Sequence, residues 1–180
     1  MKFFILNASE DMAQPRMLNW FKKVGPGPMT SEKYHKLSRI TTIEVELWSE
    51  SIFPDIVTHP CFMVANKFTE VLRTYEPGLI FKYIVLFDKK NRRSQMYAMP
   101  EVEKIVCLSD ESELNLTKSE IKRAVIGRGK VENHMLFSIA DVSNQYIVAE
   151  LRLVESLLRR QMTGLSLQEV ILCGKEKCNG

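Results

Sequence analysis

Two short patterns contain residue types that could do chemistry, and each lacks a required partner. Gly127-Arg128-Gly129-Lys130 is similar to a phosphate-binding loop, but such a loop needs a glycine five residues before the Gly-Lys pair and a Ser or Thr after the lysine. Ala124 and Val131 occupy those positions. Ser119-Glu120-Ile121-Lys122 has the spacing in which a lysine can activate a serine, without a supporting second motif. We therefore predict a solvated turn and a polar helix face.

The metal-binding residue types are also scattered. His35, His59 and His134 lie far apart and lack the i,i+4 spacing of a helical zinc site. The four cysteines show no C-x-x-C pair, which favours buried thiols over a metal or disulfide framework; they are Cys61, Cys107, Cys173 and Cys178. The sequence predicts no cofactor and no metal. An enzyme whose site is assembled from separate loops stays open as an alternative.

The sharpest charged feature is a basic loop that contains Lys89, Lys90, Arg92 and Arg93. The simplest interpretation is a solubilising hairpin tip that protects the adjacent apolar strands. The loop could instead bind an acidic protein partner, or phosphates. No aromatic residue interleaves with these cations as in single-strand binders, so nucleic acid is the less favoured partner. A nucleic-acid accessory protein that also uses Arg123, Arg128 and Lys130 stays as an alternative.

Length and composition limit the class of protein. At 180 residues the chain can bury about 70% of its unfolded surface in one core. The apolar fraction of 45%, the charged fraction of 26% and the net charge of +3 are ordinary for a soluble globular protein. No stretch is long and apolar enough for a membrane span, and the apolar opening is too short for a secretion signal. We therefore expect a cytoplasmic protein.

Two similar strand–helix–strand units organise the chain, at 62–87 and 145–173. Internal repetition constrains a fold strongly, although any two short units of this kind look alike, so a true duplication stays open. The alignment pairs Phe62-Met63-Val64-Ala65 with Tyr146-Ile147-Val148-Ala149, Gly78-Leu79 with Gly164-Leu165, and Val85-Leu86 with Ile171-Leu172.

The helices of the two units carry matching apolar stripes with helical spacing. These are Phe68, Val71, Leu72 and Tyr75 in the first helix, and Val154, Leu157, Leu158 and Gln161 in the second. This pattern places Leu158 in the core and Glu155 on the surface. Gly164 follows the second helix, where a residue that is free to adopt positive φ is favoured.

Other segments complete the predicted fold. Alternating or continuous apolar residues predict strands near 2–6, 43–47, 79–87, 95–99, 102–108 and 135–139. Thr117 with Glu120 three residues later predicts a short helix to Arg123. The mixture indicates an α+β fold, with a curved or mixed β-sheet and helices packed on one side. We expect a single domain over 1–180 with a frayed tail at 175–180.

Over residues 53–172 the chain resembles a family of small bacterial immunity proteins from polymorphic toxin systems. The residues that carry the resemblance are the opening Met-Lys-Phe-Phe-Ile-Leu, the aspartate-containing connector Phe53-Pro54-Asp55-Ile56-Val57, the strand–helix units, and Thr163-Gly164-Leu165 before the last strand. These motifs describe packing and turns and contain no catalytic signature.

The resemblance implies a binding protein that occludes the active site of a cognate toxin domain, through a surface of roughly 800 Å² per partner. Possible partner-binding residues are the basic set Lys89, Lys90, Arg92 and Arg93 and the acidic set Asp110, Glu111 and Glu113. Catalytic, cofactor-binding and metal-binding residues are not predicted.

Overall fold

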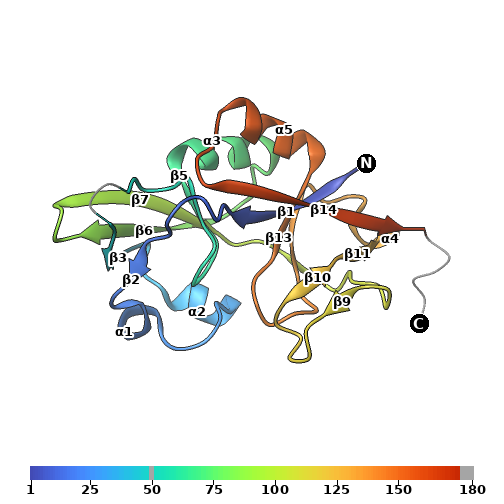
Figure 1. The fold of residues 1–180 in the computed structure, drawn as a ribbon, viewed down its shortest axis with the longest axis horizontal. Coiled ribbons are helices and arrows are strands. Elements are labelled where there is room, and N and C mark those ends of the chain that lie inside the picture. Colours follow the sequence, from blue (N-terminus) through green and yellow to red (C-terminus); the bar gives the residue numbers. More distant parts are fainter. Residues whose placement is uncertain (49–50, 175–180) are drawn as a thin grey trace.

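The computed structural model describes residues 1–48 and 51–174, so the predicted tail at 175–180 lies outside the described residues (Figure 1). With 20% helix and 37% strand in curled mixed sheets, the α+β prediction is confirmed.

The helices are α1 (Trp20–Val24), α2 (Ser31–Lys36), α3 (Asn66–Tyr75), α4 (Arg128–Val131) and α5 (Leu151–Arg159). The strands are β1 (Phe3–Ala8), β2 (Arg16–Met17), β3 (Ile40–Glu46), β4 (Ile56–Val57), β5 (Met63–Ala65), β6 (Phe81–Asp88), β7 (Arg93–Pro100), β8 (Lys104–Ile105), β9 (Glu113–Leu114), β10 (Ile121–Arg123), β11 (Val125–Gly127), β12 (Leu136–Ile139), β13 (Ile147–Glu150) and β14 (Leu165–Cys173).

Two six-stranded sheets share one internal order. The first runs β2-β3-β6-β7-β5-β4 and the second runs β11-β14-β1-β13-β12-β8. Five consecutive strands correspond: β3-β6-β7-β5-β4 matches β11-β14-β1-β13-β12, each with one parallel pair followed by three antiparallel pairs. The predicted repeat therefore has a counterpart in strand order and in strand direction.

The two halves differ in where one strand comes from. In the first half, β7 follows β6 through a tight hairpin, whereas in the second half the matching position beside β14 is taken by β1 from the start of the chain. The hairpin tip of β6–β7 therefore lies at one end of the molecule, and the end of β14 lies at the other (Figure 1). The second unit is completed by the first strand of the chain.

Strand pairing gives the register between the halves. Val64 pairs with Ile56 and Ala98, while Ala149 pairs with Leu136 and Phe4. The next residues also match, because Ala65 N–H donates to Asp55 O at 2.8 Å and Glu150 N–H donates to Met135 O at 2.9 Å. Ala65 thus corresponds to Glu150, and the expected match of Ala65 with Ala149 is wrong by one residue.

That shift explains a wrong prediction for the second helix. The buried face of α5 is formed by Leu153, Val154 and Leu157, and Leu158 is 54% exposed. In the corrected register Leu158 corresponds to the exposed Arg73 of α3, while Leu157 corresponds to the buried Leu72. The predicted apolar stripe had the correct helical spacing, but it included Leu158 in place of Leu153.

The core has three parts that follow the repeat. A central cluster lies under α3 and α5 and joins both halves, with Val64 and Phe68 from one and Ala149 and Leu153 from the other. A second cluster lies within the first half against α1 and α2, and a third lies within the second half. Burying the inward faces of both sheets requires the two halves to share side chains, so neither half holds its complete core alone.

A polar junction closes one face between the halves, and we call it the clasp: Pro54, Asp55, Thr163 and Gly164. The Asp55 Oδ2 atom accepts hydrogen bonds from Thr163 N at 2.7 Å and Thr163 Oγ1 at 3.0 Å, and Asp55 N–H donates to Thr163 O at 3.0 Å. Gly164 has the expected positive φ of 73°. The two motifs of the family resemblance therefore meet here, and their role in this chain is to join the halves.

The segment 117–123 differs from its prediction. The expected helix from Thr117 is absent, and Ile121–Arg123 forms β10 paired with β9. The Asn115 Oδ1 atom accepts hydrogen bonds from Ser119 N at 2.8 Å and Glu120 N at 3.1 Å. An Asn side chain that bonds to following backbone amides stabilises a turn in competition with a helix, so the capping pattern at Thr117 was misleading.

Candidate interaction surfaces

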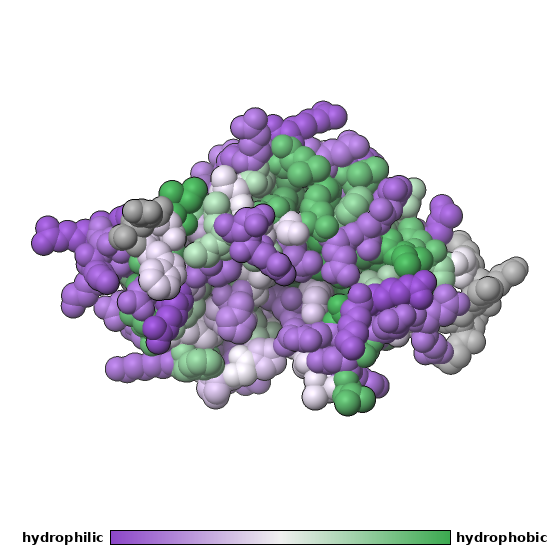
Figure 2. Space-filling view, viewed as in Figure 1, coloured by the Kyte–Doolittle hydropathy of each residue, from purple (hydrophilic) through white to green (hydrophobic). Residues whose placement is uncertain are grey.

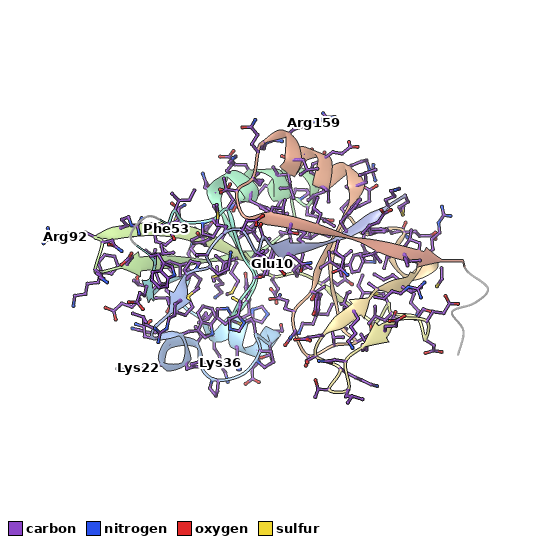
Figure 3. All side chains as sticks on the ribbon, in the orientation of Figure 1. Glu10, Lys22, Lys36, Phe53, Arg92 and Arg159 are labelled. Carbon is purple, nitrogen blue, oxygen red and sulfur yellow. The ribbon has the colours of Figure 1, made fainter. Side chains whose placement is uncertain are left out.

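The predicted basic loop lies at the tip of the β6–β7 hairpin. β6 ends at Asp88 and β7 begins at Arg93, which leaves the tip to the four residues 89–92. Lys89, Lys90 and Arg92 are exposed. Arg92 has φ 53° and lies at the extreme end of the molecule (Figure 3). Three cations are therefore presented together at a narrow, projecting end.

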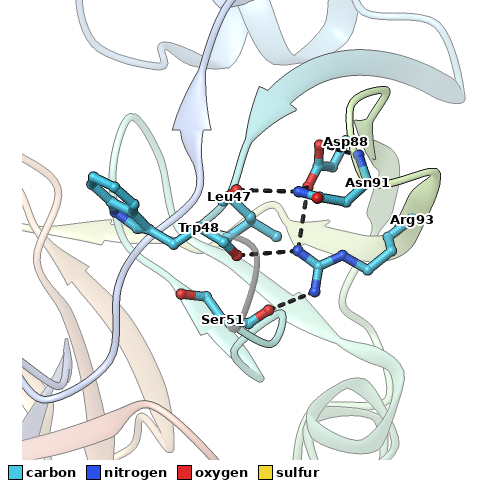
Figure 4. A network of polar contacts seen from close by, with 6 residues as sticks. All are labelled: Leu47, Trp48, Ser51, Asp88, Asn91 and Arg93. Atoms are coloured by element: carbon cyan, nitrogen blue, oxygen red, sulfur yellow. Dashed lines mark hydrogen bonds and ion pairs between the residues drawn. The ribbon is translucent and has the colours of Figure 1, made fainter.

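A buried carboxylate organises the base of this tip (Figure 4). Asp88 is 0% exposed, and its carboxylate accepts hydrogen bonds from Asn91 Nδ2 at 2.6 Å, Asn91 N at 3.2 Å and Arg93 Nη2 at 3.3 Å. The hydrogen bond from the Asn91 side chain is the largest cause of a lowered pKa for Asp88, and Arg93 adds to it against the opposing effect of burial. The carboxylate therefore stays ionised and fixes the turn.

The fourth predicted cation has a different role. Arg93 donates to Ser51 O at 2.7 Å and to Trp48 O at 3.3 Å, besides its contact with Asp88. Its side chain is 32% exposed. The guanidinium thus joins the hairpin to the segment after β3, and Lys89, Lys90 and Arg92 are the cations that remain available to a partner.

Apolar residues accompany these cations. Trp48 is 79% exposed and Leu18 is 53% exposed. A groove of about 290 Å³ is lined by Leu18, Lys89 and Lys90 together with Glu44 and Glu46. The carbonyl contact of Arg93 places the Trp48 backbone at the base of the tip, and the indole points away from Asp88, Asn91 and Arg93 (Figure 4). We call Leu18, Trp48, Lys89, Lys90 and Arg92 the tip surface. Figure 2 shows hydrophilic side chains at this end, and apolar ones reaching the surface near α5.

The exposure of Trp48 has a signal in the sequence. Ile43, Val45 and Leu47 are buried, and the residues between them alternate to the other face of the strand. Continuing that alternation by one residue places Trp48 outward, after Glu44 and Glu46. A large aromatic residue on the outward side of a strand end was therefore predictable.

The predicted acidic set lies elsewhere. Asp110, Glu111 and Glu113 are exposed in and before β9, and Glu113 approaches Arg123 on β10 at 3.8 Å. The β9–β10 pair and the β6–β7 tip lie at opposite ends of the molecule (Figure 1). The structure therefore does not bring the acidic and basic sets together.

The cysteines and histidines of the described residues do not form a metal site. Cys61 and Cys107 are buried free thiols. Burial raises the pKa of Cys61, and burial first and Asp141 second raise the pKa of Cys107 to about 12. Cys173 is disulfide-bonded, so the buried-thiol prediction is wrong there. Over residues 1–48 and 51–174, no group of three metal-ligating side chains could hold an ion.

Comparison with protein-family models and with curated proteins finds no match to this chain. In the same described ranges, no helix is both long and apolar enough to cross a membrane.

Proposed function

We propose that this protein is an immunity protein that binds a cognate toxin domain and blocks its active site. The observation that carries the proposal is the tip surface, where a hairpin fixed by hydrogen bonds presents three exposed cations and an exposed tryptophan lies at its base. Trp and Arg are enriched among the residues that dominate binding energy at protein interfaces. The family resemblance over 53–172 points to the same kind of activity.

The rigidity of the tip supports a binding role. A partner that meets a disordered loop must order it, at about 0.5–1.5 kcal/mol for each immobilised side chain. Here Asp88, Asn91 and Arg93 already fix the hairpin and the backbone at Leu47 and Trp48. These hydrogen bonds therefore preform the backbone of the tip, so a partner has to order only the exposed side chains.

The charge of the tip surface indicates the chemistry of the partner. Lys89, Lys90 and Arg92 attract an acidic surface, and such charges speed association and select the partner more than they add affinity. Trp48 and Leu18 supply apolar contact area beside them. The predicted partner face therefore combines carboxylates with an apolar pocket that receives the indole.

Co-expression provides the test. The C-terminal domain of the protein encoded by the neighbouring gene is first tested for toxicity in bacteria. It is then expressed with the wild-type protein, with Trp48→Ala, or with the double variant Lys89→Glu/Arg92→Glu. Protection and co-purification are expected with the wild-type protein. Each tip variant should weaken the complex at least tenfold, since a central interface residue contributes 2 kcal/mol or more.

The matched control is Arg159→Glu, an exposed cation on α5 that lies far from the tip (Figure 3). It reverses a charge without touching the tip surface, so protection should persist. Thermal melting of each variant separates lost binding from lost folding. Full protection by both tip variants, or loss of protection in the Arg159 control alone, would contradict the proposal.

A further inference from the structure

A cleft lies at a second junction between the two halves, at positions that match those of the clasp. In the register set by the strand pairs, His134 corresponds to Pro54 and Gly78 corresponds to Gly164. At the clasp, a Cβ on Gly164 would lie 2.8 Å from Pro54 Cβ, whereas a Cβ on Gly78 would have no heavy atom within 4 Å. The same junction is therefore closed on one face of the molecule and open on the other.

The path of the chain explains the opening. After β1, Ser9 stays beside β14 and donates its N–H to Gly164 O at 2.8 Å. After β7, the matching residue Glu103 leaves its own sheet, and its carbonyl accepts from Ser138 N at 2.8 Å in the other half. Residues 101–105 thus bridge the two sheets as one wall of the cleft, which has a volume of about 720 Å³. Small-molecule sites have this size.

The lining combines apolar walls with an excess of negative charge. Leu79, Val102, Leu136 and Tyr34 are among the apolar and aromatic contributors. The charged residue types in the lining are Glu76, Glu101, Glu103 and Lys104, whose formal charges sum to −2. Two imidazoles face these carboxylates: His35 Nε2 lies 3.0 Å from Glu101 Oε1, and His134 Nδ1 lies 3.7 Å from Glu103 Oε2. The complementary ligand is a cation with an apolar portion.

One carboxylate of the cleft is already oriented. The Glu101 Oε1 atom lies 3.1 Å from Ser31 Oγ and 3.0 Å from His35 Nε2. Over the described residues, Glu101 Oε2 receives no hydrogen bond. Tyr34 on the same wall is 3% exposed, and the Glu101 side chain is 28% exposed, so the carboxylate is partly shielded from solvent. A fixed acceptor in such a setting suits a charged donor.

We propose that the cleft is a binding site for a ligand that carries a guanidinium group on a short aliphatic stem. The planar guanidinium presents several N–H donors in a fixed arrangement that matches carboxylates. Glu101 Oε2 would accept from it, Glu76 and Glu103 would add negative potential, and the apolar wall would pack against the stem. This site is separate from the tip surface and does not depend on toxin binding.

The test uses L-arginine amide as the probe, followed by backbone amide NMR of the purified full chain. We expect saturable shifts of the Leu79 and His134 amide signals. L-citrulline amide, which has the same shape without the charge, should bind at least tenfold more weakly. The tripeptide Gly-Arg-Gly distinguishes a free amino-acid derivative from an arginine within a peptide, according to which of the two probes binds more tightly.

Two variants and a control link any binding to the cleft. Gly78→Phe should fill the open space and abolish binding, and its thermal midpoint should stay close to that of the wild type because Gly78 has no close neighbour. Glu101→Gln should weaken binding at least tenfold. Glu155→Gln removes an exposed carboxylate on α5 and should bind as the wild type does. Absence of saturable shifts, equal binding of citrulline amide, or undiminished binding by Gly78→Phe would overturn the proposal.

Discussion

The clasp and the cleft lie at matching junctions between the two similar halves. The clasp is closely packed, whereas the cleft is open. At the clasp, Asp55 and Thr163 exchange hydrogen bonds, and Gly164 leaves no room for a side chain. At the cleft, the matching positions hold Met135, Pro77 and Gly78, and the chain between β7 and β8 crosses to the other sheet. The repeated strand order thus determines the overall fold, and the different path of the chain after β7 opens the cleft.

The same comparison shows that a sequence motif can have a structural role without being a binding surface. The connector at Asp55 and the Thr163-Gly164 turn are motifs on which the expected resemblance rests, and the Asp55 carboxylate accepts hydrogen bonds from Thr163. Their contribution in this chain is to hold the halves together. The surfaces available to other molecules, at Trp48 and at Glu101, lie outside those motifs.

The largest expected effect tests the register between the halves. Leu157→Ala should destabilise the protein by about 2–5 kcal/mol because it leaves a cavity in the shared core. Leu158→Ala should cost less than about 1 kcal/mol, since the side chain is mostly exposed. Urea unfolding of both variants provides the measurement. Equal costs would mean that the two helices do not correspond as the strand pairing indicates.

The next effect compares the two glycines. Gly164→Ala should cost about 2–4 kcal/mol, because alanine is strained at positive φ and its Cβ would collide with Pro54. Gly78→Ala should change the unfolding free energy by less than about 1 kcal/mol. Chemical denaturation of the two alanine variants measures the cost of adding the same methyl group at two matching positions. A large loss at Gly78 would show that the second junction is also tightly packed.

A smaller effect is expected from the clasp carboxylate. Asp55→Ala should cost about 1–3 kcal/mol, because the Thr163 amide loses its acceptor. Asp55→Asn keeps an oxygen acceptor and should cost less. Thermal unfolding of both variants is the measurement. If the Asn variant is as unstable as the Ala variant, the charge, including the contact with Lys67 at 3.7 Å, outweighs the hydrogen bonds.

The smallest effect concerns pH and the tip. The folded-state pKa of Asp88 is lowered, so its ionised form stabilises the fold above the ordinary pKa of about 4. That contribution is lost as the pH falls through the lowered folded-state pKa. The stability advantage of the wild type over Asp88→Asn should therefore be present at pH 7 and shrink in strong acid. An advantage that grows on acidification would contradict this role for Asp88.

Periodicity was sufficient to predict the α+β class, the β6–β7 hairpin and both long helices, because these depend on residues close in sequence. It failed at Leu158, since one residue decides which face of a helix is buried and only the strand pairing fixes that register. Periodicity could not predict the pairing of β1 with β14 either, because 156 residues lie between Ala8 and its partner Leu165 in the sequence.

The candidate surfaces also differ in whether they depend on residues close in sequence or on distant ones. The cations at the tip were visible as a run in the sequence, whereas the inward role of Arg93 required the carbonyls of Trp48 and Ser51 to be placed beside it. Glu76, Glu101 and His134 come from three distant segments, and their convergence depends on the crossing of residues 101–105. No local pattern could have indicated that cleft.

Amide hydrogen exchange compares the two junctions most directly in a single measurement. Asp55 N–H donates across the clasp to Thr163 O, and Ser9 N–H donates to Gly164 O from the neighbouring end of β1, so both should exchange slowly. Their counterparts, the Met135 and Glu103 amides, donate to no acceptor within residues 1–48 and 51–174, and both should exchange much faster. Equal protection at the two junctions would contradict the closed and open states on which this comparison depends.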